Sequence, residues 1–222
     1  MVAASRYPTI VGAQLMHFKD TVTNAAQLRE LFGEPVPRAV AKTLASLNQH
    51  CRAFIARSPF LLVASSNADG QMDVSPKGDP PGFVQVLDDS TLAIPERPGN
   101  RRADTYNNVL ENPKVGLIFL VPGKTETLRV SGTAQIVRDL DLRESMAVRG
   151  KTPDFALAVT VQEAFFHCSK CMIRSHLWDT ADWPSLDGLP SLAQTAVEAA
   201  KLQTPVQEVH EAVKRDEVDR LY

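Results

Sequence analysis

The chain has 222 residues, 44% of them hydrophobic, which suffices for one domain of upper-middle size with helical attachments. A net charge of −2 and the absence of a Lys/Arg tract argue against nucleic acid as a partner. No apolar run approaches the roughly 20 residues that cross a bilayer, and the N-terminus lacks the basic-then-apolar order of a secretion signal. The three cysteines, an odd number, suit a reducing compartment. We therefore expect a cytoplasmic protein without a membrane partner.

Helices are predicted before a β-rich region. Residues 1–22 have weak periodicity and are interpreted as an extended lead-in. Asn24 followed by Gln27 predicts a capping box for a short helix that Gly33 ends. From Pro37 a longer helix is predicted to continue until Ser58 and to lie on a sheet, because apolar residues recur at helical spacing: Val40, Leu44, Leu47, Cys51, Phe54 and Ile55.

Beyond Pro59 the pattern changes to short strands separated by turns. Hairpins are predicted over 60–75 and 83–95, long strands over 114–121 and 127–137, and a last strand over 156–166. Helices are predicted over 101–111 and 139–150. Six or so strands with hairpin connections favour a closed or nearly closed antiparallel barrel over a parallel sheet, which would need more crossover helices.

The last part of the chain is predicted to be helical. Ser191 begins an Ala-rich helix and Pro205 precedes a final one, and these helices could cover a partner subunit. We therefore expect a lead-in with a short helix over residues 1–36, a barrel domain over 37–180 and a helical extension over 181–222.

Two adjacent arginines are the strongest candidate binding residues. Arg101 and Arg102 follow the turn Pro98-Gly99 at the start of a predicted helix. Exposed arginine is common, so both could be ordinary surface residues. Positive charge at a helix N-terminus, however, opposes the helix dipole unless an anion neutralises it. Guanidinium groups beside free backbone N–H groups therefore predict a phosphate site.

Three segments carry a resemblance to a known family. Taken in order, 74–83 (VSPKGDPPGF), 98–103 (PGNRRA) and 110–119 (LENPKVGLIF) resemble the pyridoxamine 5′-phosphate oxidase-like family of FMN-binding split β-barrels over about residues 38–180. The resemblance implies a mainly β (α+β) fold, a six-stranded antiparallel split β-barrel with flanking helices. It also implies a homodimer that binds FMN at the subunit interface and acts on a small-molecule substrate.

The resemblance further implies the residues that contact the cofactor. The family's pattern of Gly, a small polar residue, Arg and a second basic residue falls on Gly99–Arg102, which assigns the phosphate to Asn100, Arg101 and Arg102. A strand ending in a basic residue would pass along the flavin, where a cation stabilises the reduced ring. The remaining expected contacts are Asp73, Val74, Ser75 and Lys77 on that strand, Ile94 and Pro95 beside the ring, Thr127 on a later strand, and Lys170, Arg174 and Trp178 from the partner subunit.

A Cys-x-x-Cys pair leaves other chemistry open. Cys168 and Cys171 could be a redox pair or half of a metal site. Zinc would need two more ligands, with only His167 and His176 nearby, and a thioredoxin-type pair would need a βαβ context. Two buried, unpaired thiols are the expected state, with no metal bound.

The resemblance implies an FMN-binding flavoprotein that is an oxidoreductase. The family's oxidase ends in an Arg-Leu-x-Pro type motif that contributes to substrate phosphate binding, whereas this chain ends in helices that carry Glu and Val, so pyridoxamine phosphate is not expected as the substrate. Two alternatives remain: a flavin-binding sensor without turnover, and a relative of the barrel that uses a deazaflavin or haem. Haem would need an axial ligand, for which His167 and His176 are the candidates.

Overall fold

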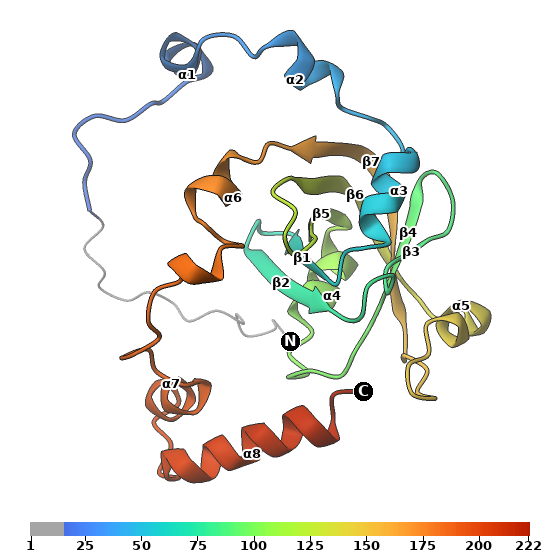
Figure 1. Cartoon of the computed structure of the whole chain (residues 1–222), viewed down its shortest axis with the longest axis vertical. Coiled ribbons are helices and arrows are strands. Elements are labelled where there is room, and N and C mark those ends of the chain that lie inside the picture. Colours follow the sequence, from blue (N-terminus) through green and yellow to red (C-terminus); the bar gives the residue numbers. More distant parts are fainter. Residues whose placement is uncertain (1–15) are drawn as a thin grey trace. The chain divides into compact units, whose positions relative to one another are not determined.

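A computed structural model describes residues 16–222, so the lead-in predicted for residues 1–22 lies mostly outside the described residues (Figure 1). The chain divides into two units, residues 1–41 and 42–222. The first contains α1 (Ala25–Phe32) and α2 (Pro37–Ala41). The Asn24 side chain accepts the Gln27 N–H at 3.0 Å, and α1 ends at Gly33 with a φ of 68°, which confirms both predicted ends of this helix. The Gln27 side chain, however, accepts from the backbone of Thr23 rather than from that of Asn24.

The single helix predicted from Pro37 to Ser58 is wrong. The chain leaves the helix after Ala41 and resumes it as α3 (Gln49–Ile55). Between them Leu44 pairs with Ala164 through two backbone hydrogen bonds of 2.9 and 2.8 Å, which an α-helix could not supply. The Asn48 side chain then caps α3, whose face of Cys51, Phe54 and Ile55 is buried. The expectation that this helix packs on the sheet is therefore confirmed for its second half only.

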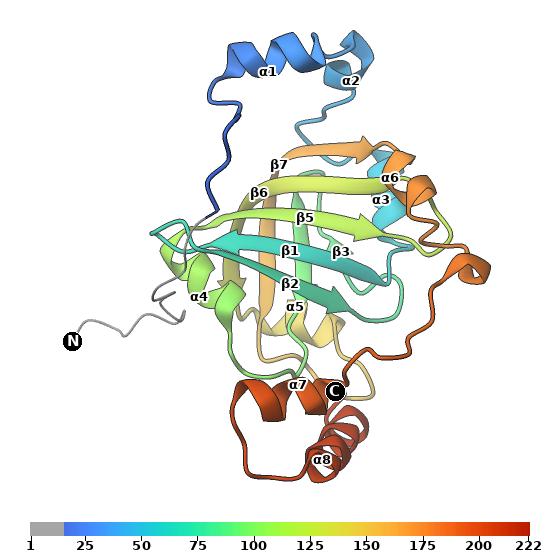
Figure 2. The same cartoon turned by 90° about the vertical axis from the view of Figure 1, so that its left-hand side faces the viewer.

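Seven antiparallel strands form one sheet. They are β1 (Phe60–Ser66), β2 (Met72–Gly78), β3 (Gln85–Val86), β4 (Thr91–Pro95), β5 (Lys114–Leu120), β6 (Thr127–Val137) and β7 (Ala156–His167). Their order is β2-β1-β5-β6-β7-β4-β3, and Figure 2 shows β2, β1, β5 and β6 as successive neighbours. The resemblance implies six strands. The structure has seven because the two-residue β3, which pairs with β4, is also a strand of the sheet.

The sheet curls into a split barrel. Inward side chains from strands far apart in the sheet share one buried core: Leu61 and Val63 of β1, Leu92 and Ile94 of β4, Phe119 of β5 and Val159 of β7. A flat sheet could not bring β1 and β4 together across three intervening strands. Among the described residues no ladder joins β2 to β3, so the barrel is open between these edges. The fold predicted from the sequence is confirmed.

An irregularity in β6 depends on a glycine. The pairing of β6 with β7 shifts register between Ser131 and Gly132, and a Cβ added to Gly132 would lie 2.0 Å from the Thr160 carbonyl oxygen. The backbones approach too closely for any side chain. On β5, by contrast, the nearest heavy atom to a Cβ added to Gly116 would be the Ala64 Cβ at 3.9 Å.

We expect Gly132→Ala to lower the free energy of unfolding by about 1–3 kcal/mol or more, since backbone must shift to admit the methyl group. Urea unfolding measures this change. Gly116→Ala is the matched control and should change stability much less; equal effects of the two substitutions would contradict the close approach.

The remaining helices are α4 (Asp104–Glu111), α5 (Leu140–Ser145), α6 (Lys170–Arg174), the 3₁₀ helix η1 (Thr180–Asp182), α7 (Leu192–Ala199) and α8 (Val206–Asp219). α4 begins later than predicted, so both arginines precede it. α5 ends earlier than residue 150, because Val148 and Lys151 pair around a turn at Gly150. Both C-terminal helices are confirmed, α7 with a complete capping box at Ser191. In the part of the chain described, we find no helix of the length and apolarity that a bilayer span requires.

Candidate functional site

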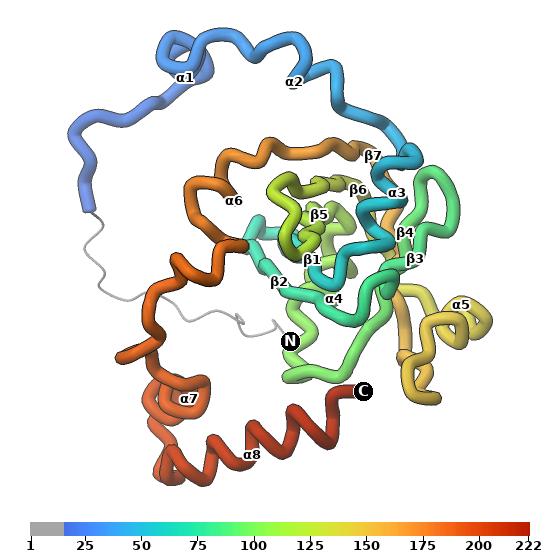
Figure 3. Tube along the Cα trace, viewed as in Figure 1, coloured from blue at the N-terminus to red at the C-terminus, as the bar shows by residue number. Residues whose placement is uncertain are grey.

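A cavity of about 1060 Å³ is lined by segments that lie far apart in the sequence. The chain leaves β4, runs through the loop 96–103 and enters α4, as the trace in Figure 3 shows. This loop meets β2 from Asp73 onward, the start of α4, the segment 151–155 and the end of α8 around the cavity. The volume is slightly above the usual range for small-molecule sites, which ends at about 1,000 Å³.

Most of the residues expected to contact a cofactor line this cavity: Asp73, Val74, Ser75, Lys77, Pro95, Asn100, Arg101 and Arg102. Ile94 does not, because alternation along β4 turns it into the barrel core, where it is 2% exposed. The fold therefore brings together the motif on β2 and the motif that follows β4.

The other expected residues lie elsewhere on the same chain. Thr127 is buried at the start of β6, opposite His167. The Trp178 indole donates to the Lys124 carbonyl at 2.8 Å. Neither these residues nor Lys170 and Arg174 line the cavity within the chain. Lys170, Arg174 and Trp178 were assigned to a partner's site, and that assignment stays a prediction.

The loop before α4 is held in an unusual backbone conformation. Arg101 and Ala103 have φ values of 60° and 58°, in the left-handed region that residues with side chains rarely adopt. The Arg102 N–H donates to Asn100 Oδ1 at 3.0 Å, and Arg102 Nε pairs with Asp104 Oδ2 at 2.7 Å. Strain of this kind persists where a surrounding structure enforces it, and it is typical of binding loops.

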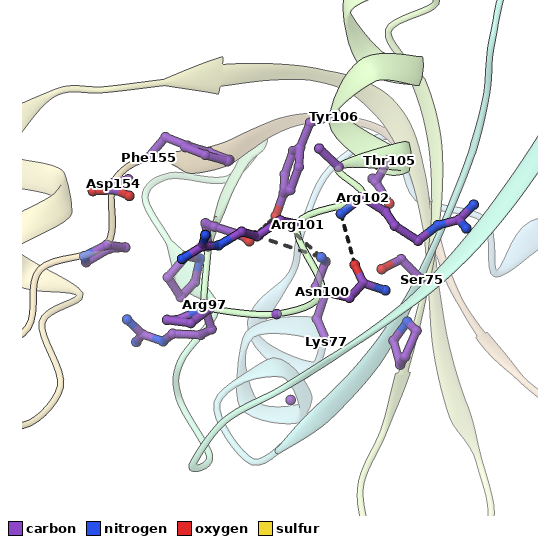
Figure 4. A pocket seen from close by; sticks show the side chains of 18 of the residues that line it. Ser75, Lys77, Arg97, Asn100, Arg101, Arg102, Thr105, Tyr106, Asp154 and Phe155 are labelled. Atoms are coloured by element: carbon purple, nitrogen blue, oxygen red, sulfur yellow. Dashed lines mark hydrogen bonds and ion pairs between the residues drawn. The ribbon is translucent and has the colours of Figure 1, made fainter. Parts of the chain in front are cut away.

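Arg101 differs from its neighbour Arg102, because no residue in the described part of the chain neutralises its charge. Its guanidinium makes no hydrogen bond or ion pair with any residue between 16 and 222, and it lines the cavity (Figure 4). Ala103 occupies the N-cap of α4, and no side chain caps the first turn. An unpaired guanidinium beside an uncapped helix start attracts an anion.

α4 is fixed to the sheet by buried polar contacts. Thr105 donates to Asp73 Oδ2 at 2.7 Å, and the Asn108 amide donates to the Ser65 hydroxyl at 3.2 Å. Asp73 is thus engaged with α4 as well as lining the cavity. These contacts set the position of the helix that follows the two arginines.

Lys77 belongs to a polar cluster that the sequence did not predict. Its Nζ lies 3.3 Å from the Tyr106 hydroxyl and 3.9 Å from Glu96 Oε2, and Tyr106 donates to Glu96. The Tyr106 ring packs edge-on against Phe155 at 4.7 Å. Figure 4 shows Lys77, Tyr106 and Phe155 of this cluster. The one signal in the sequence was that Glu96 and Tyr106 flank the Arg101-Arg102 motif.

Burial raises the pKa of Glu96 above its ordinary value, against the opposing effects of Lys77 and Arg97. The folded state therefore binds more protons than the unfolded state above about pH 4.5, and this carboxyl makes the free energy of unfolding fall as pH rises through that range. We expect Glu96→Gln to remove this contribution, so that the variant gains stability relative to the parent between pH 4.5 and 7. Urea unfolding of the parent and the variant at pH 4.5 and pH 7 tests this. If the parent instead became more stable relative to the variant at the higher pH, the prediction would be contradicted.

Cys168 and Cys171 are unpaired, as predicted, but the prediction that they are buried is wrong. Both are exposed, because they lie at the end of β7 and on α6, a helix with no buried residue. Among the described residues the one cluster with metal-ligand spacing is His176, Asp179 and Asp182, all exposed, and it includes neither cysteine. His167 and His176 do not line the cavity, so neither candidate haem ligand faces it.

One outer face of the barrel is apolar. Outward side chains of three neighbouring strands lie in register there: Phe60, Leu62 and Ala64 of β1, Val74 and Pro76 of β2, and Ile118 and Leu120 of β5. Phe60, Val74 and Ile118 are exposed. We call this set the β1-β2-β5 face; its strand β2 also borders the cavity.

Comparison with known proteins identifies the family. Residues 47–168, more than half of the chain, match the family model described as pyridoxamine 5′-phosphate oxidase. The chain belongs to this family. The matched region contains most of the segments that line the cavity, namely β2, the loop 96–103, α4 and residues 151–155. The end of α8 lies outside it.

Several solved structures share similarity with the barrel. HupZ from Group A Streptococcus is 22% identical, with 54% of this chain and 93% of that chain covered and a TM-score of 0.44. A Clostridium acetobutylicum protein related to general stress protein 26 is 17% identical, with coverages of 53% and 85% and a TM-score of 0.39. An FMN-binding protein from Syntrophomonas wolfei is 10% identical, with coverages of 64% and 96% and a TM-score of 0.41. No curated protein matches the chain.

Proposed function

We propose that the protein is an FMN-dependent oxidoreductase that acts on a small molecule. The observation that carries the proposal is the Arg101 guanidinium, which has no partner among residues 16–222 and lines one cavity together with Arg102, Ser75 and Lys77. This donor set suits a terminal phosphate on one part of a ligand and an electron-rich ring on another.

FMN fits the residues present. Asn100, Arg101 and Arg102 would hold its phosphate, and residues 73–77 would lie along its ring. Bound FMN would supply a ring that accepts two electrons from one molecule and passes them to another. Lys77 would place a positive charge beside the ring, and Tyr106 and Glu96 would keep the lysine in place through the contacts described above.

We further propose that the functional unit is a homodimer. An apolar surface of the kind found on the β1-β2-β5 face is common at subunit interfaces. A second copy on this face would lie beside β2 and could bring Lys170, Arg174 and Trp178 to the cavity of its partner. The cavity, which is open in one chain, would then be completed by two.

The test is the cofactor content of the purified protein. We expect a yellow protein that releases FMN, identified by mass and by its absorption spectrum. Its bound flavin should take two electrons from a reductant and pass them to a small-molecule acceptor. A deazaflavin or haem spectrum, or a colourless protein that fails to bind added FMN, would overturn the cofactor assignment. Bound FMN without turnover towards any reductant would instead indicate a flavin-binding sensor.

A further inference from the structure

The chain after α8 is anchored on the barrel by one residue. We call the last residue of α8 and the three residues after it, 219–222, the arm. The Tyr222 hydroxyl donates to Asp79 Oδ1 at 2.7 Å, and its backbone oxygen accepts from Lys151 Nζ. The guanidinium carbons of Arg97 and Arg149 lie 5.7 and 5.1 Å from its ring centroid, within the range of cation–π contacts.

The acceptor of this anchor is a buried carboxylate. The Asp79 side chain is 1% exposed, and its other oxygen accepts from Arg97 Nε at 2.6 Å. Both oxygens of Asp79 are therefore used, one by Arg97 and one by Tyr222. Leaving one oxygen of a buried carboxylate without a donor is costly, so the arm and the Asp79–Arg97 pair stabilise each other.

Arg97 connects the anchor to the binding loop. It lies in the same loop as Arg101 and also donates to the Met146 carbonyl at 2.9 Å. Asp219, Arg220 and Tyr222 line the same cavity as Arg101 and Lys77. The family match ends at residue 168, so this wall lies outside the matched region.

We propose that the arm is a specificity wall: locked by Tyr222 on the Asp79–Arg97 pair, it closes part of the cavity and limits its ligands to those that fit beneath it. The inference rests on the proposed function only for the identity of the ligand. It identifies Tyr222 as a positioning residue and restricts the substrate to a compact small molecule, since bulkier compounds would have to displace the arm.

The hydroxyl stays a donor over the ordinary pH range. The hydrogen bond to Asp79 raises the pKa of Tyr222 above its usual value, so the phenol keeps its proton. The hydrogen bond from Tyr222 to Asp79 therefore keeps its donor at neutral pH.

Hydrogen exchange on the full chain tests the anchor without any ligand. In Tyr222→Ala we expect amide exchange about tenfold faster or more in α8 and in the cavity-lining segments 96–103 and 151–155. Tyr222→Phe keeps the ring but loses the donor, and should fall between this variant and the parent. Val218→Ala, on an exposed position of α8, is the control and should match the parent. Parent-like exchange in Tyr222→Ala would overturn the anchor, and parent-like exchange in Tyr222→Phe would overturn its dependence on Asp79.

Flavin release tests the wall. We expect FMN to dissociate about tenfold faster from Tyr222→Ala than from the parent, with an unchanged rate in Val218→Ala. A bulky acceptor such as cytochrome c should also reoxidise the reduced variant faster than the reduced parent, while the rate with ferricyanide stays the same. Faster exchange in α8 with unchanged release and unchanged acceptor preference would overturn the wall. If neither the parent nor any variant binds FMN, the proposed function fails, and exchange in the cavity-lining segments 96–103 and 151–155 alone decides whether Tyr222 holds the arm against the cavity.

Discussion

Arg101→Ala is expected to weaken FMN binding by about tenfold to more than a hundredfold, since a charge-assisted contact to phosphate contributes about 1.5–3 kcal/mol. Arg101 is the suitable target because its guanidinium has no competing partner among residues 16–222. Arg102→Ala should cost less, since Asp104 already neutralises part of its charge at 2.7 Å. Arg101→Lys keeps the charge but loses the two-pronged geometry, so its loss should be intermediate.

Riboflavin supplies the decisive control for this prediction. It has the same ring as FMN but no phosphate, so its affinity should be the same for the parent and for Arg101→Ala. Calorimetric titration of both ligands measures the difference. An equal loss for riboflavin would mean that the substitution has disturbed the loop with its positive φ angles, and undiminished FMN binding would mean that Arg101 is an ordinary surface residue.

The cavity-lining motifs could be predicted from the sequence because they are local. Ser75 and Lys77 are delivered by a hairpin, and Arg101 by a loop just after a strand, so short-range patterns placed each of them. Their convergence followed from the family resemblance rather than from periodicity. Glu96 and Tyr106 were missed because their role depends on a contact with Lys77 across 19 and 29 positions in the sequence, which no local pattern reports.

Errors in the predicted helices have a physical cause. The apolar spacing from Val40 to Ile55 is helical throughout, but Leu44 pairs with Ala164 of β7, and a tertiary contact overrides local propensity. The contact of Tyr222 with the barrel is a second feature that the sequence did not predict, because it joins residues that lie far apart in the chain. Its partner Asp79 is separated from it by 143 positions, and the sequence contains nothing that would pair them.

The second large effect is expected at the β1-β2-β5 face. Ile118→Asp should convert the proposed homodimer into a monomer, because an unpaired carboxylate would be buried between subunits, weakening the dimer by about a hundredfold or more. Ile118 points outward from β5 and does not line the cavity. Any loss of FMN affinity in this variant therefore reports the loss of the partner rather than of a direct contact. Gln135→Asp, exposed on β6, is the matched control.

Sedimentation velocity across protein concentration, with and without FMN, measures this effect, and far-ultraviolet circular dichroism verifies that the monomer stays folded. A dimeric Ile118→Asp would exclude this face as the interface, and a concentration-independent monomer of the parent that retains FMN would exclude the interface site altogether.

Arg174→Ala should separate assembly from binding: if Arg174 reaches the partner's flavin, the variant stays dimeric while its FMN affinity falls. Trp178→Ala is less clean, because its indole also donates to the Lys124 carbonyl at 2.8 Å within the same chain. A tight FMN site in dimeric Arg174→Ala would therefore remove this arginine from the site without disturbing the dimer.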